Sequence, residues 1–250
     1  MKKKSIICLL FLFISTLSNG FAQYSQTNFA SDSVQVKKSK KLNPGLGKEV
    51  FSGKNLAIFG ASLGGAFLLD EWAKDHIQSH QSNFLKQYTD VATVFGEKKI
   101  MAPATLATWG IGLAIKDERL TQTALNSGKA LITGAILTES IKFIAGRSRP
   151  DMNRGNMHFD AFGGTTNNTK SFPSGHAFVA WSVFTPFAME YSKWIYLIPA
   201  SVSFARMYRS RHWFSDVVLG SGIGYFAGLY FHKRKNQRVL FSGNGLVIKF

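Results

Sequence analysis

Apolar stretches of 11 to 15 residues alternate with polar loops along most of the chain. They cover residues 56–69, 101–115, 131–144, 177–189, 194–204 and 217–231. These stretches are rich in Ala, Gly, Leu and Phe, and none has the strict apolar–polar alternation of a half-buried strand. The pattern predicts six helices and therefore an all-α fold.

Residues 70–99 follow a different pattern, in which isolated apolar residues recur at spacings that suit one or two amphipathic helices. The last apolar stretch carries Gly220, Gly224 and Gly228 at every fourth position, which permits close approach of a neighbouring helix. The long loop 145–172 is expected to be functional, because structureless segments of that length are uncommon in compact domains. Near the C-terminus, Asn244-Gly245 between two apolar runs predicts a short β-hairpin.

The N-terminal residues have the features of a secretory signal peptide. Lys2 and its two lysine neighbours precede an apolar run at 6–17, and Gly20-Phe21-Ala22 forms a cleavage site. The run is too short to span a bilayer, although an uncleaved anchor is the alternative interpretation. We therefore expect a signal peptide at 1–22, a polar linker at 23–52, a catalytic domain at 53–236 and a tail at 237–250. The single cysteine, Cys8, lies in the signal peptide, so the mature chain would have neither a disulfide nor a cysteine metal site.

The formal charge of +16 narrows the range of partners. Export argues against nucleic acid, as does the lack of a basic helix face with interleaved aromatic residues. Anionic lipid headgroups or phosphorylated substrates agree better with this charge.

Three short clusters carry the candidate chemistry. The first is Lys142 with Arg149-Pro150, the second is Pro173-Ser174-Gly175-His176, and the third is Arg206 with His212 and Asp216. If consecutive helices run antiparallel, the end of the third, the start of the fourth, the end of the fifth and the start of the sixth meet at one end of the bundle. All three clusters would then converge.

Converged in this way, the clusters would form an anion site. The cations Lys142, Arg149 and Arg206 would face two helix N-termini, whose unpaired N–H groups attract negative charge. Gly175 would let the backbone approach a phosphate closely.

The histidines supply candidate catalytic groups. His212 and Asp216 are four residues apart and would share a helix face, so that Asp216 could fix the imidazole tautomer. His176 could donate a proton to a leaving oxygen. The residues alone do not decide which histidine is the nucleophile.

Each cluster taken alone also has a structural explanation: Lys142 could extend to the surface, Ser174 could cap a helix, and His212 could form a structural pair with Asp216. Three further arginines are expected to be solvated or to face lipid headgroups, namely Arg147, Arg209 and Arg211.

Together, the three clusters resemble the signature of the type 2 phosphatidic acid phosphatase (PAP2) family, which shares a superfamily with bacterial acid phosphatases and vanadium haloperoxidases. The resemblance covers residues 56–231 and includes Leu69-Asp70-Glu71-Trp72. Ala205 departs from the family pattern, which usually has Ser before the arginine, and Phe214 stands where Pro is common.

The resemblance implies a six-helix bundle core and a metal-independent site without a cofactor. His212 would attack phosphorus, Asp216 would orient it, and His176 would protonate the leaving group and then activate water. Phosphate would be bound by Lys142, Arg149, Ser174, the Gly175 N–H and Arg206.

We therefore expect a phosphatase for phosphate monoesters or diphosphates, with lipids such as phosphatidate, isoprenyl phosphates or lipid A as substrates. It would be exported to the bacterial cell envelope and membrane-associated, with the site facing the periplasm. The alternatives are a soluble periplasmic acid phosphatase, a vanadate-dependent haloperoxidase and a non-catalytic lipid-phosphate-binding protein.

Overall fold

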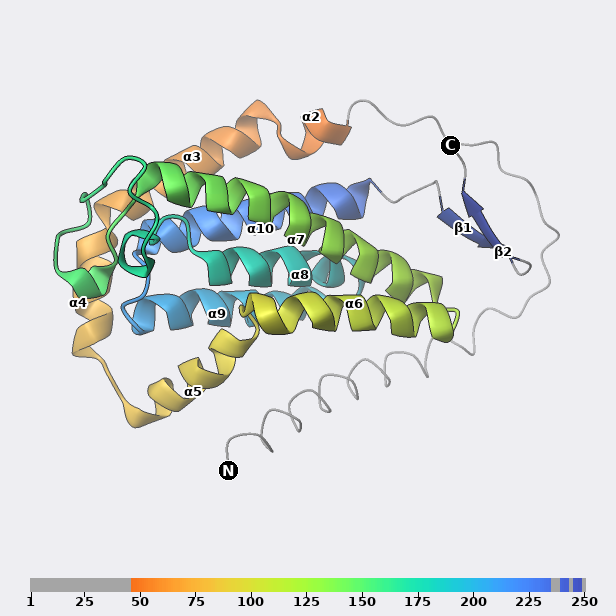
Figure 1. Cartoon of the computed structure of the whole chain (residues 1–250), viewed down its shortest axis with the longest axis horizontal. Helices are drawn as coiled ribbons and strands as arrows, with labels where there is room; N and C mark the ends of the chain where they lie inside the picture. The colour runs from red at the N-terminus through yellow and green to blue at the C-terminus, as the bar shows by residue number, and fades with distance from the viewer. Residues whose placement is uncertain (1–45, 235–238, 243–244, 249–250) are drawn as a thin grey trace. The chain divides into compact units, whose positions relative to one another are not determined.

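The structure, a computed structural model, describes residues 46–234, 239–242 and 245–248. This part of the chain is predominantly helical, which confirms the predicted all-α class (Figure 1). The expected signal peptide at 1–22 and the expected linker up to residue 45 lie outside the described residues.

The helices follow one another with short connections, except for the long loop after α7. They are α2 (Leu46–Val50), α3 (Gly53–Leu68), α4 (Asp70–Ser79), α5 (Asn83–Val94), α6 (Lys98–Ala114), α7 (Glu118–Ala145), α8 (Gly175–Glu190), α9 (Leu197–Tyr208) and α10 (Phe214–Lys233), with the 3₁₀ turns η1 (Pro150–Met152), η2 (Asn167–Thr169) and η3 (Lys193–Tyr196). Helix α2 lies inside the predicted linker and its Val50 is buried, so ordered structure begins before residue 53.

The tail holds two short strands, β1 (Val239–Ser242) and β2 (Gly245–Ile248), which pair antiparallel. Leu240 lies opposite Val247 in this pairing. The two strands flank the Asn244-Gly245 position at which the sequence predicts a hairpin.

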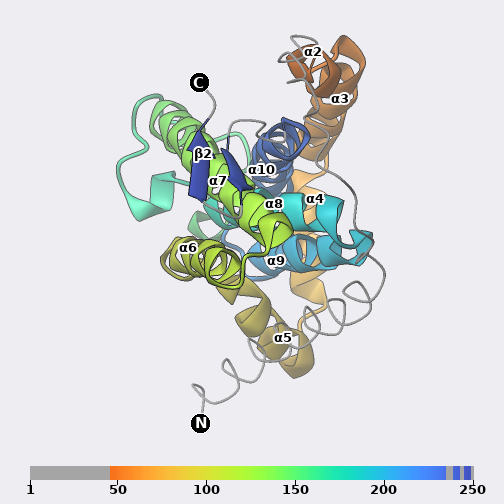
Figure 2. The same ribbon diagram turned by 90° about the vertical axis from the view of Figure 1, so that its right-hand side faces the viewer.

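Helix α8 forms the centre of the bundle. It packs against α10, α7, α9 and α6 (Figures 1 and 2). A helix that is apolar on every side must be buried on every side, and α8 meets this condition from Ala177 to Ala188 with few exceptions.

Helix α7 begins at Glu118, whereas the apolar pattern predicted a start near residue 131. Its first half is buried but polar, and the hydroxyls there donate to backbone carbonyls. Thr123 Oγ1 donates to the Arg119 carbonyl at 2.8 Å, and Ser127 Oγ donates across to the Val183 carbonyl of α8 at 2.9 Å. A pattern based on apolar residues cannot detect a buried helix face that is satisfied by hydrogen bonds.

The three glycines Gly220, Gly224 and Gly228 form a stripe on α10 that packs directly on α8, as their spacing predicted. A Cβ atom at Gly220 would lie 2.4 Å from the Ser174 carbonyl oxygen, and one at Gly224 would lie 2.5 Å from the Phe178 carbonyl oxygen. Such distances are far below van der Waals contact, so only glycine fits. Helix α10 therefore approaches the backbone of α8 more closely than a helix with side chains on this face could.

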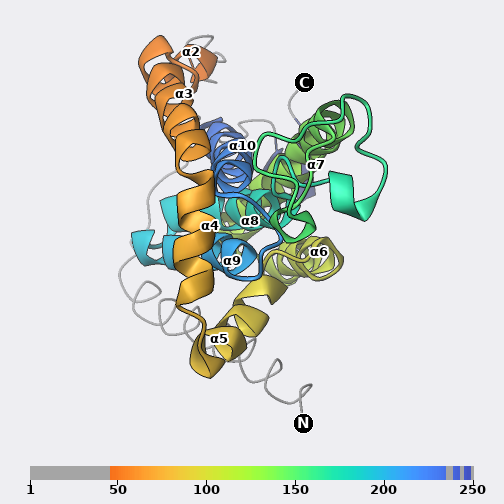
Figure 3. The same cartoon turned by 90° about the vertical axis from the view of Figure 1, so that its left-hand side faces the viewer.

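Four helix ends meet at one end of the bundle, as the antiparallel arrangement predicted. They are the end of α7, the start of α8, the end of α9 and the start of α10, and α4 with α5 lie across this end (Figure 3). Helix α7 stops at Gly146, which takes a left-handed conformation with φ of 55°. The loop that follows stays at the same end and returns the chain to the start of α8.

Among the described residues, no individual helix is both long enough and apolar enough to cross a bilayer. Helices α3 and α4, bent by 59° where they meet, satisfy the length and composition requirement only as a pair.

Candidate active site

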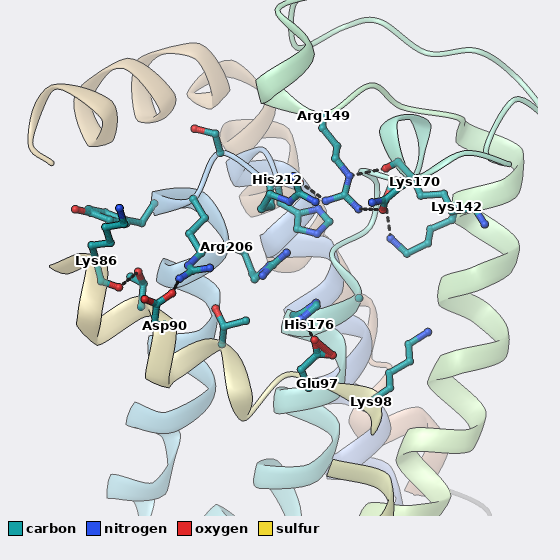
Figure 4. Close-up of a pocket in the computed structure, with 18 of the residues that line it drawn as sticks. Lys86, Asp90, Glu97, Lys98, Lys142, Arg149, Lys170, His176, Arg206 and His212 are labelled. Carbon is teal, nitrogen blue, oxygen red and sulfur yellow. Dashed lines mark hydrogen bonds and ion pairs between the residues drawn. The ribbon is translucent and has the colours of Figure 1, made fainter. Parts of the chain in front are cut away.

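A cleft of about 1080 Å³ opens at the end where the four helix ends meet (Figure 4). Nine basic side chains line it against three acidic ones, so the cleft is strongly electropositive. Both His176 and His212 line it as well. Helix α5 and the start of α6 form the wall opposite the loop that follows α7 (Figure 4).

Lys142 lies in the last turn of α7 and is buried rather than extended to the surface. Its Nζ donates to the Lys170 carbonyl at 2.9 Å and to the Pro173 carbonyl at 2.5 Å. Burial lowers the pKa of Lys142 to about 8, and the neighbouring carboxylates Asp216 and Glu139 oppose that shift. The carbonyls fix the ammonium group at the wall of the cleft.

Arg149 precedes η1, and three backbone or amide oxygens hold its guanidinium. Nε donates to the Asn167 carbonyl at 2.6 Å, Nη2 to Asn167 Oδ1 at 3.1 Å, and Nη1 to the Arg211 carbonyl at 2.8 Å. Burial lowers the pKa of Arg149, and the charge of Arg211 acts in the same direction. A rigid guanidinium of this kind suits the recognition of phosphate oxygens.

Arg206 lies in the last turn of α9, and its Nε is buried without a hydrogen-bond partner among the described residues. Burial lowers its pKa to about 10, and Arg149 and Arg211 contribute to the shift. A buried donor without an acceptor is costly unless a ligand supplies one. Arg206 therefore has the properties of an anion-binding side chain.

The start of α8 also faces the cleft, through Gly175 and His176. Ser174 is fully buried behind them, and its Oγ accepts from the Ala177 N–H at 3.5 Å as the helix cap. Ser174 does not line the cleft, so this structure gives it the capping position rather than the phosphate contact.

The start of α10 does not face the cleft, contrary to expectation. The N–H of Ser215, in its first turn, donates to Asp70 Oδ1 at 2.8 Å. Of the two helix N-termini predicted to bind the anion, only that of α8 is directed into the cleft.

His212 precedes α10 instead of sharing a helix face with Asp216, so that prediction was wrong. Its Nδ1 lies 2.8 Å from the Ser171 carbonyl oxygen but 3.6 Å from Asp216 Oδ2. The carbonyl can only accept, so Nδ1 carries the proton and Nε2 is unprotonated. Burial lowers the pKa of His212 well below its ordinary value, and the charges of Lys142 and Arg206 add to this.

Asp216 forms hydrogen bonds with Ser171 and Trp213, the residues whose backbone lies next to His212. It accepts from Ser171 Oγ at 2.5 Å and from the Trp213 N–H at 2.8 Å, on either side of the imidazole. Burial raises the pKa of Asp216, and the Arg147 guanidinium opposes that shift. The carboxylate thus fixes the two backbone segments between which His212 is held.

Arg147 was expected to be solvated, and that expectation was wrong. It is fully buried and donates to Asp216 Oδ1 at 2.6 Å and to Asp70 Oδ2 at 2.7 Å. The guanidinium also lies over aromatic rings, with the Phe67 ring centroid 4.9 Å away. Sequence reasoning missed this residue, although the Leu69–Trp72 stretch of the resemblance contains its partner Asp70.

Arg209 and Arg211 line the cleft, and their side chains are 33% and 40% exposed. Arg209 pairs with Asp90 of α5, and Arg211 pairs with Asp151 at 3.0 Å. They are therefore ion-paired at the rim rather than freely solvated.

His176, in the first turn of α8, has its Nε2 3.7 Å from Glu97 Oε1 (Figure 4). Burial lowers the pKa of His176 to about 3, and the charges of Arg206, Arg149, Lys142 and Lys98 add to that shift. No sequence signal singled out Glu97, because it lies outside the three clusters.

Within the described ranges, no three His, Cys, Asp or Glu side chains are grouped so that they could hold a metal ion. That the site works without a metal stays a prediction.

The helical fold brings the three clusters together in one electropositive cleft, and comparison with known proteins relates part of the chain to a family. The family model of the PAP2 superfamily matches residues 123–239, a range that contains every predicted site residue. The segment 123–239 therefore belongs to the PAP2 superfamily, as the three motifs within it indicated.

Particular relatives agree with this assignment. The chain is 33% identical over 108 residues to a lipid A 1-phosphatase of Porphyromonas gingivalis; the match covers 40% of this chain and 21% of that protein. The chain thus spans about one-fifth of the length of that relative.

Two crystal structures are also similar. LpxE of Aquifex aeolicus matches with 18% identity and a TM-score of 0.52, over 66% of this chain and 95% of that one, and therefore has the same fold. A transmembrane PAP2-type phosphatidylglycerolphosphate phosphatase of Bacillus subtilis matches with 20% identity and a TM-score of 0.47, over 74% of this chain and 88% of that one.

Proposed function

We propose that this chain is a phosphatase that hydrolyses phosphate monoesters or diphosphates through a phosphohistidine on His212. The observation that carries the proposal is the hydrogen bond from His212 Nδ1 to the Ser171 carbonyl at 2.8 Å. It leaves the Nε2 lone pair of a neutral imidazole beside a cleft with nine basic side chains. A nucleophile held next to an anion site is what phosphoryl transfer requires.

In the first step, His212 Nε2 forms a bond to phosphorus while the bond from phosphorus to the leaving oxygen breaks. His176 gives its proton to that oxygen, so the leaving group departs as a neutral alcohol. The phosphoryl oxygens bind Lys142, Arg149 and Arg206. The ring of His212 gains positive charge, which the Asp216 carboxylate, 3.6 Å from Nδ1, stabilises.

In the second step, the now neutral His176 takes a proton from water. The water oxygen bonds to phosphorus and the bond to His212 Nε2 breaks, which returns the lone pair to the ring. Inorganic phosphate leaves, and both histidines regain their starting states.

Protonation of His176 depends on the charge of the ligand. Burial and, to a smaller extent, the surrounding cations lower its pKa to about 3. A bound phosphate dianion would neutralise those cations, and the pKa would rise. Substrate binding and protonation of the acid are therefore coupled.

Lipid phosphates are the substrates that the surface favours. Helix α5 lines the cleft with Lys86 and Thr89, and on its other faces it exposes Phe84 and Tyr88. Phe84 is 76% exposed. An acyl or isoprenyl chain could lie along such a face while its phosphate enters the cleft.

Further apolar side chains are exposed on α6 and α7, which supports membrane association. They are Leu106, Ile111, Ile132, Ile136 and Leu137. The related P. gingivalis protein is named for a lipid phosphate. Together with the predicted signal peptide, this favours an envelope enzyme with its cleft towards the periplasm, and phosphatidate, isoprenyl phosphates and lipid A as candidate substrates.

The test compares two histidine variants of the full chain in detergent, with lipid phosphates and with 4-nitrophenyl phosphate. His212→Ala should release no phosphate from either ester. His176→Ala should lose activity on lipid esters by about 10²- to 10⁴-fold, because an alkoxide leaves poorly without a proton.

Nitrophenolate leaves without a proton, so His176→Ala should still be phosphorylated by that ester and should accumulate an acid-labile phosphoenzyme. Label trapped on His212→Ala but not on His176→Ala would reverse the assignment of the two histidines. Absence of phosphate release by the wild type from every ester would refute the proposed activity.

A further inference from the structure

The connection between α5 and α6 lies directly against His176. A Cβ atom at Gly96 would be 2.8 Å from His176 Cβ and 2.9 Å from the His176 carbonyl oxygen. The backbone of the connection therefore touches α8 with no space for a side chain. The next residue, Glu97, is the N-cap of α6, and its carbonyl accepts from the Met101 N–H at 2.8 Å. Both contacts fix the backbone from which the Glu97 side chain extends.

The Glu97 carboxylate reaches the acid of the proposed mechanism. Its Oε1 lies 3.7 Å from His176 Nε2, and among the described residues no other carboxylate forms an ion pair with that ring (Figure 4). The other two acidic side chains of the cleft have different partners: Glu139 pairs with Lys98, and Asp90 pairs with Arg209.

The other groups whose charge acts most strongly on His176 are basic. They come from five different segments, namely Lys98 of α6, Lys142 of α7, Arg149 of the following loop, Arg206 of α9 and His212 before α10. The four lysine and arginine cations disfavour a protonated His176 imidazole, as His212 does when it is positively charged, and Glu97 is the carboxylate in contact that favours it.

We propose that Glu97 is a positioning residue that acts through His176, holding its Nε2 towards the cleft and keeping the ring protonated while a phosphate ester is bound. This inference rests on the proposed function, in which His176 is the proton donor. Glu97 does not act on the reacting atoms itself. Its carboxylate offsets part of the positive field that the anion site requires, so one cleft can both bind phosphate and hold a protonated acid.

The size of the effect follows from the distance and the exposure. At about 4 Å, the interaction between two unit charges is about four times stronger near a protein surface than in bulk water. The Glu97 side chain is 45% exposed, which places the contact between these limits. Removing the charge should lower the apparent pKa of His176 in the complex by about one unit.

The kinetic test is the pH profile of kcat for a lipid phosphate ester, measured for the wild type, Glu97→Gln and Glu97→Asp. In Glu97→Gln the alkaline limb, along which His176 loses its proton, should move to lower pH by about one unit. Glu97→Asp keeps the charge and should move the limb less. The matched control is Asp90→Asn, which removes one charge from the same cleft but from a carboxylate paired with Arg209. The alkaline limb of the Asp90→Asn pH profile should stay at the wild-type pH.

A second readout does not need turnover. The His176 imidazole of the full chain can be titrated by NMR in the presence of tungstate, an oxyanion that stays a dianion at neutral and alkaline pH. The titration midpoint should be about one unit lower in Glu97→Gln than in the wild type and unchanged in Asp90→Asn.

An unchanged midpoint in Glu97→Gln would overturn the inference, as would equal shifts in Glu97→Gln and Asp90→Asn, which would indicate a general charge effect. If the wild type releases no phosphate but the midpoint shifts as expected, the proposed function fails and the contact between Glu97 and His176 stands.

Discussion

The variant Asp70→Ala removes a carboxylate on which the buried network behind His212 depends. Asp70 Oδ2 accepts from Arg147 Nη2 and from Ser215 Oγ, both at 2.7 Å, and Oδ1 accepts from the Ser215 N–H at 2.8 Å. Asp70 and Arg147 are fully buried, so water cannot take the place of the lost oxygens. Arg147 would keep Asp216 as its remaining ion-pair partner, and the first turn of α10 would lose its acceptor.

The magnitude follows from the burial. Removing one partner of a buried ion pair costs about 3–5 kcal/mol, whereas a whole domain is stable by about 5–15 kcal/mol. The unfolding equilibrium constant should therefore rise by about 10²- to 10⁴-fold. Activity should fall as well, because Asp216 holds Ser171 and Trp213 around His212. A displacement of about 1 Å at that position can cost about 10²-fold in kcat.

Chemical denaturation followed by circular dichroism measures the first effect, and kcat of the folded fraction measures the second. Asp75→Ala, on the same helix, is the matched control, because the Asp75 side chain is exposed and its loss should cost less than about 1 kcal/mol. Asp70→Asn keeps an oxygen for the Ser215 N–H and should fall between the two. An Asp70→Ala protein within about 1 kcal/mol of the wild type would refute the reasoning about this network.

Three further predictions follow from the site and the packing. Turnover should continue in the presence of EDTA, and inhibition by EDTA that zinc or magnesium reverses would contradict the mechanism. Orthovanadate should inhibit turnover, because it can adopt the five-coordinate geometry of phosphoryl transfer. Gly220→Ala should lower the free energy of unfolding by about 1–3 kcal/mol, because the new Cβ meets the Ser174 carbonyl, whereas Gly64→Ala in open space should raise it by about 0.5–1 kcal/mol. The free energy of unfolding should fall as the pH drops below about 6.5, because the histidines of the unfolded chain then take up protons that the folded chain does not. His176 and His212 should each contribute up to about 1.4 kcal/mol per pH unit. Denaturation at pH 7 and 5 should give a shallower dependence in His176→Gln, and an unchanged slope would contradict the assignment of a low pKa to that residue.

The placement of the site was predictable because it depends on connectivity. Short links between helices force neighbours to run antiparallel, so residues at alternate helix ends must meet. The stripe at Gly220, Gly224 and Gly228 was predictable for a similar reason, since its spacing alone defines one helix face.

The support of the site was not predictable to the same extent. Arg147 resembles any loop arginine in the sequence, and only the fold shows that two carboxylates, 77 residues before it and 69 after it, enclose its guanidinium. The contact of His212 with the Ser171 carbonyl also involves no side chain of Ser171. A backbone acceptor leaves no mark in residue identity, which explains why Asp216 was expected in that position.

The boundaries of α7 were missed because the pattern weighs apolar residues. Thr121, Thr123 and Ser127 are buried, and their hydroxyls donate to backbone carbonyls, so the helix core there is polar. Glu97 was missed for yet another reason: its partner His176 is 79 residues away, and the contact depends on how the α5–α6 connection crosses α8.

The separation of the two ends of the bundle allows each end to be labelled without disturbing the other. The sequence contains one cysteine, Cys8, which removal of the predicted signal peptide would eliminate. A thiol introduced at exposed Glu118, where α7 begins, would then report on the end away from the cleft, and one at exposed Gln81 would report on the cleft end. With a maleimide that does not cross membranes, cells expressing each variant would reveal which end faces the outside, and the unlabelled end would provide the internal control.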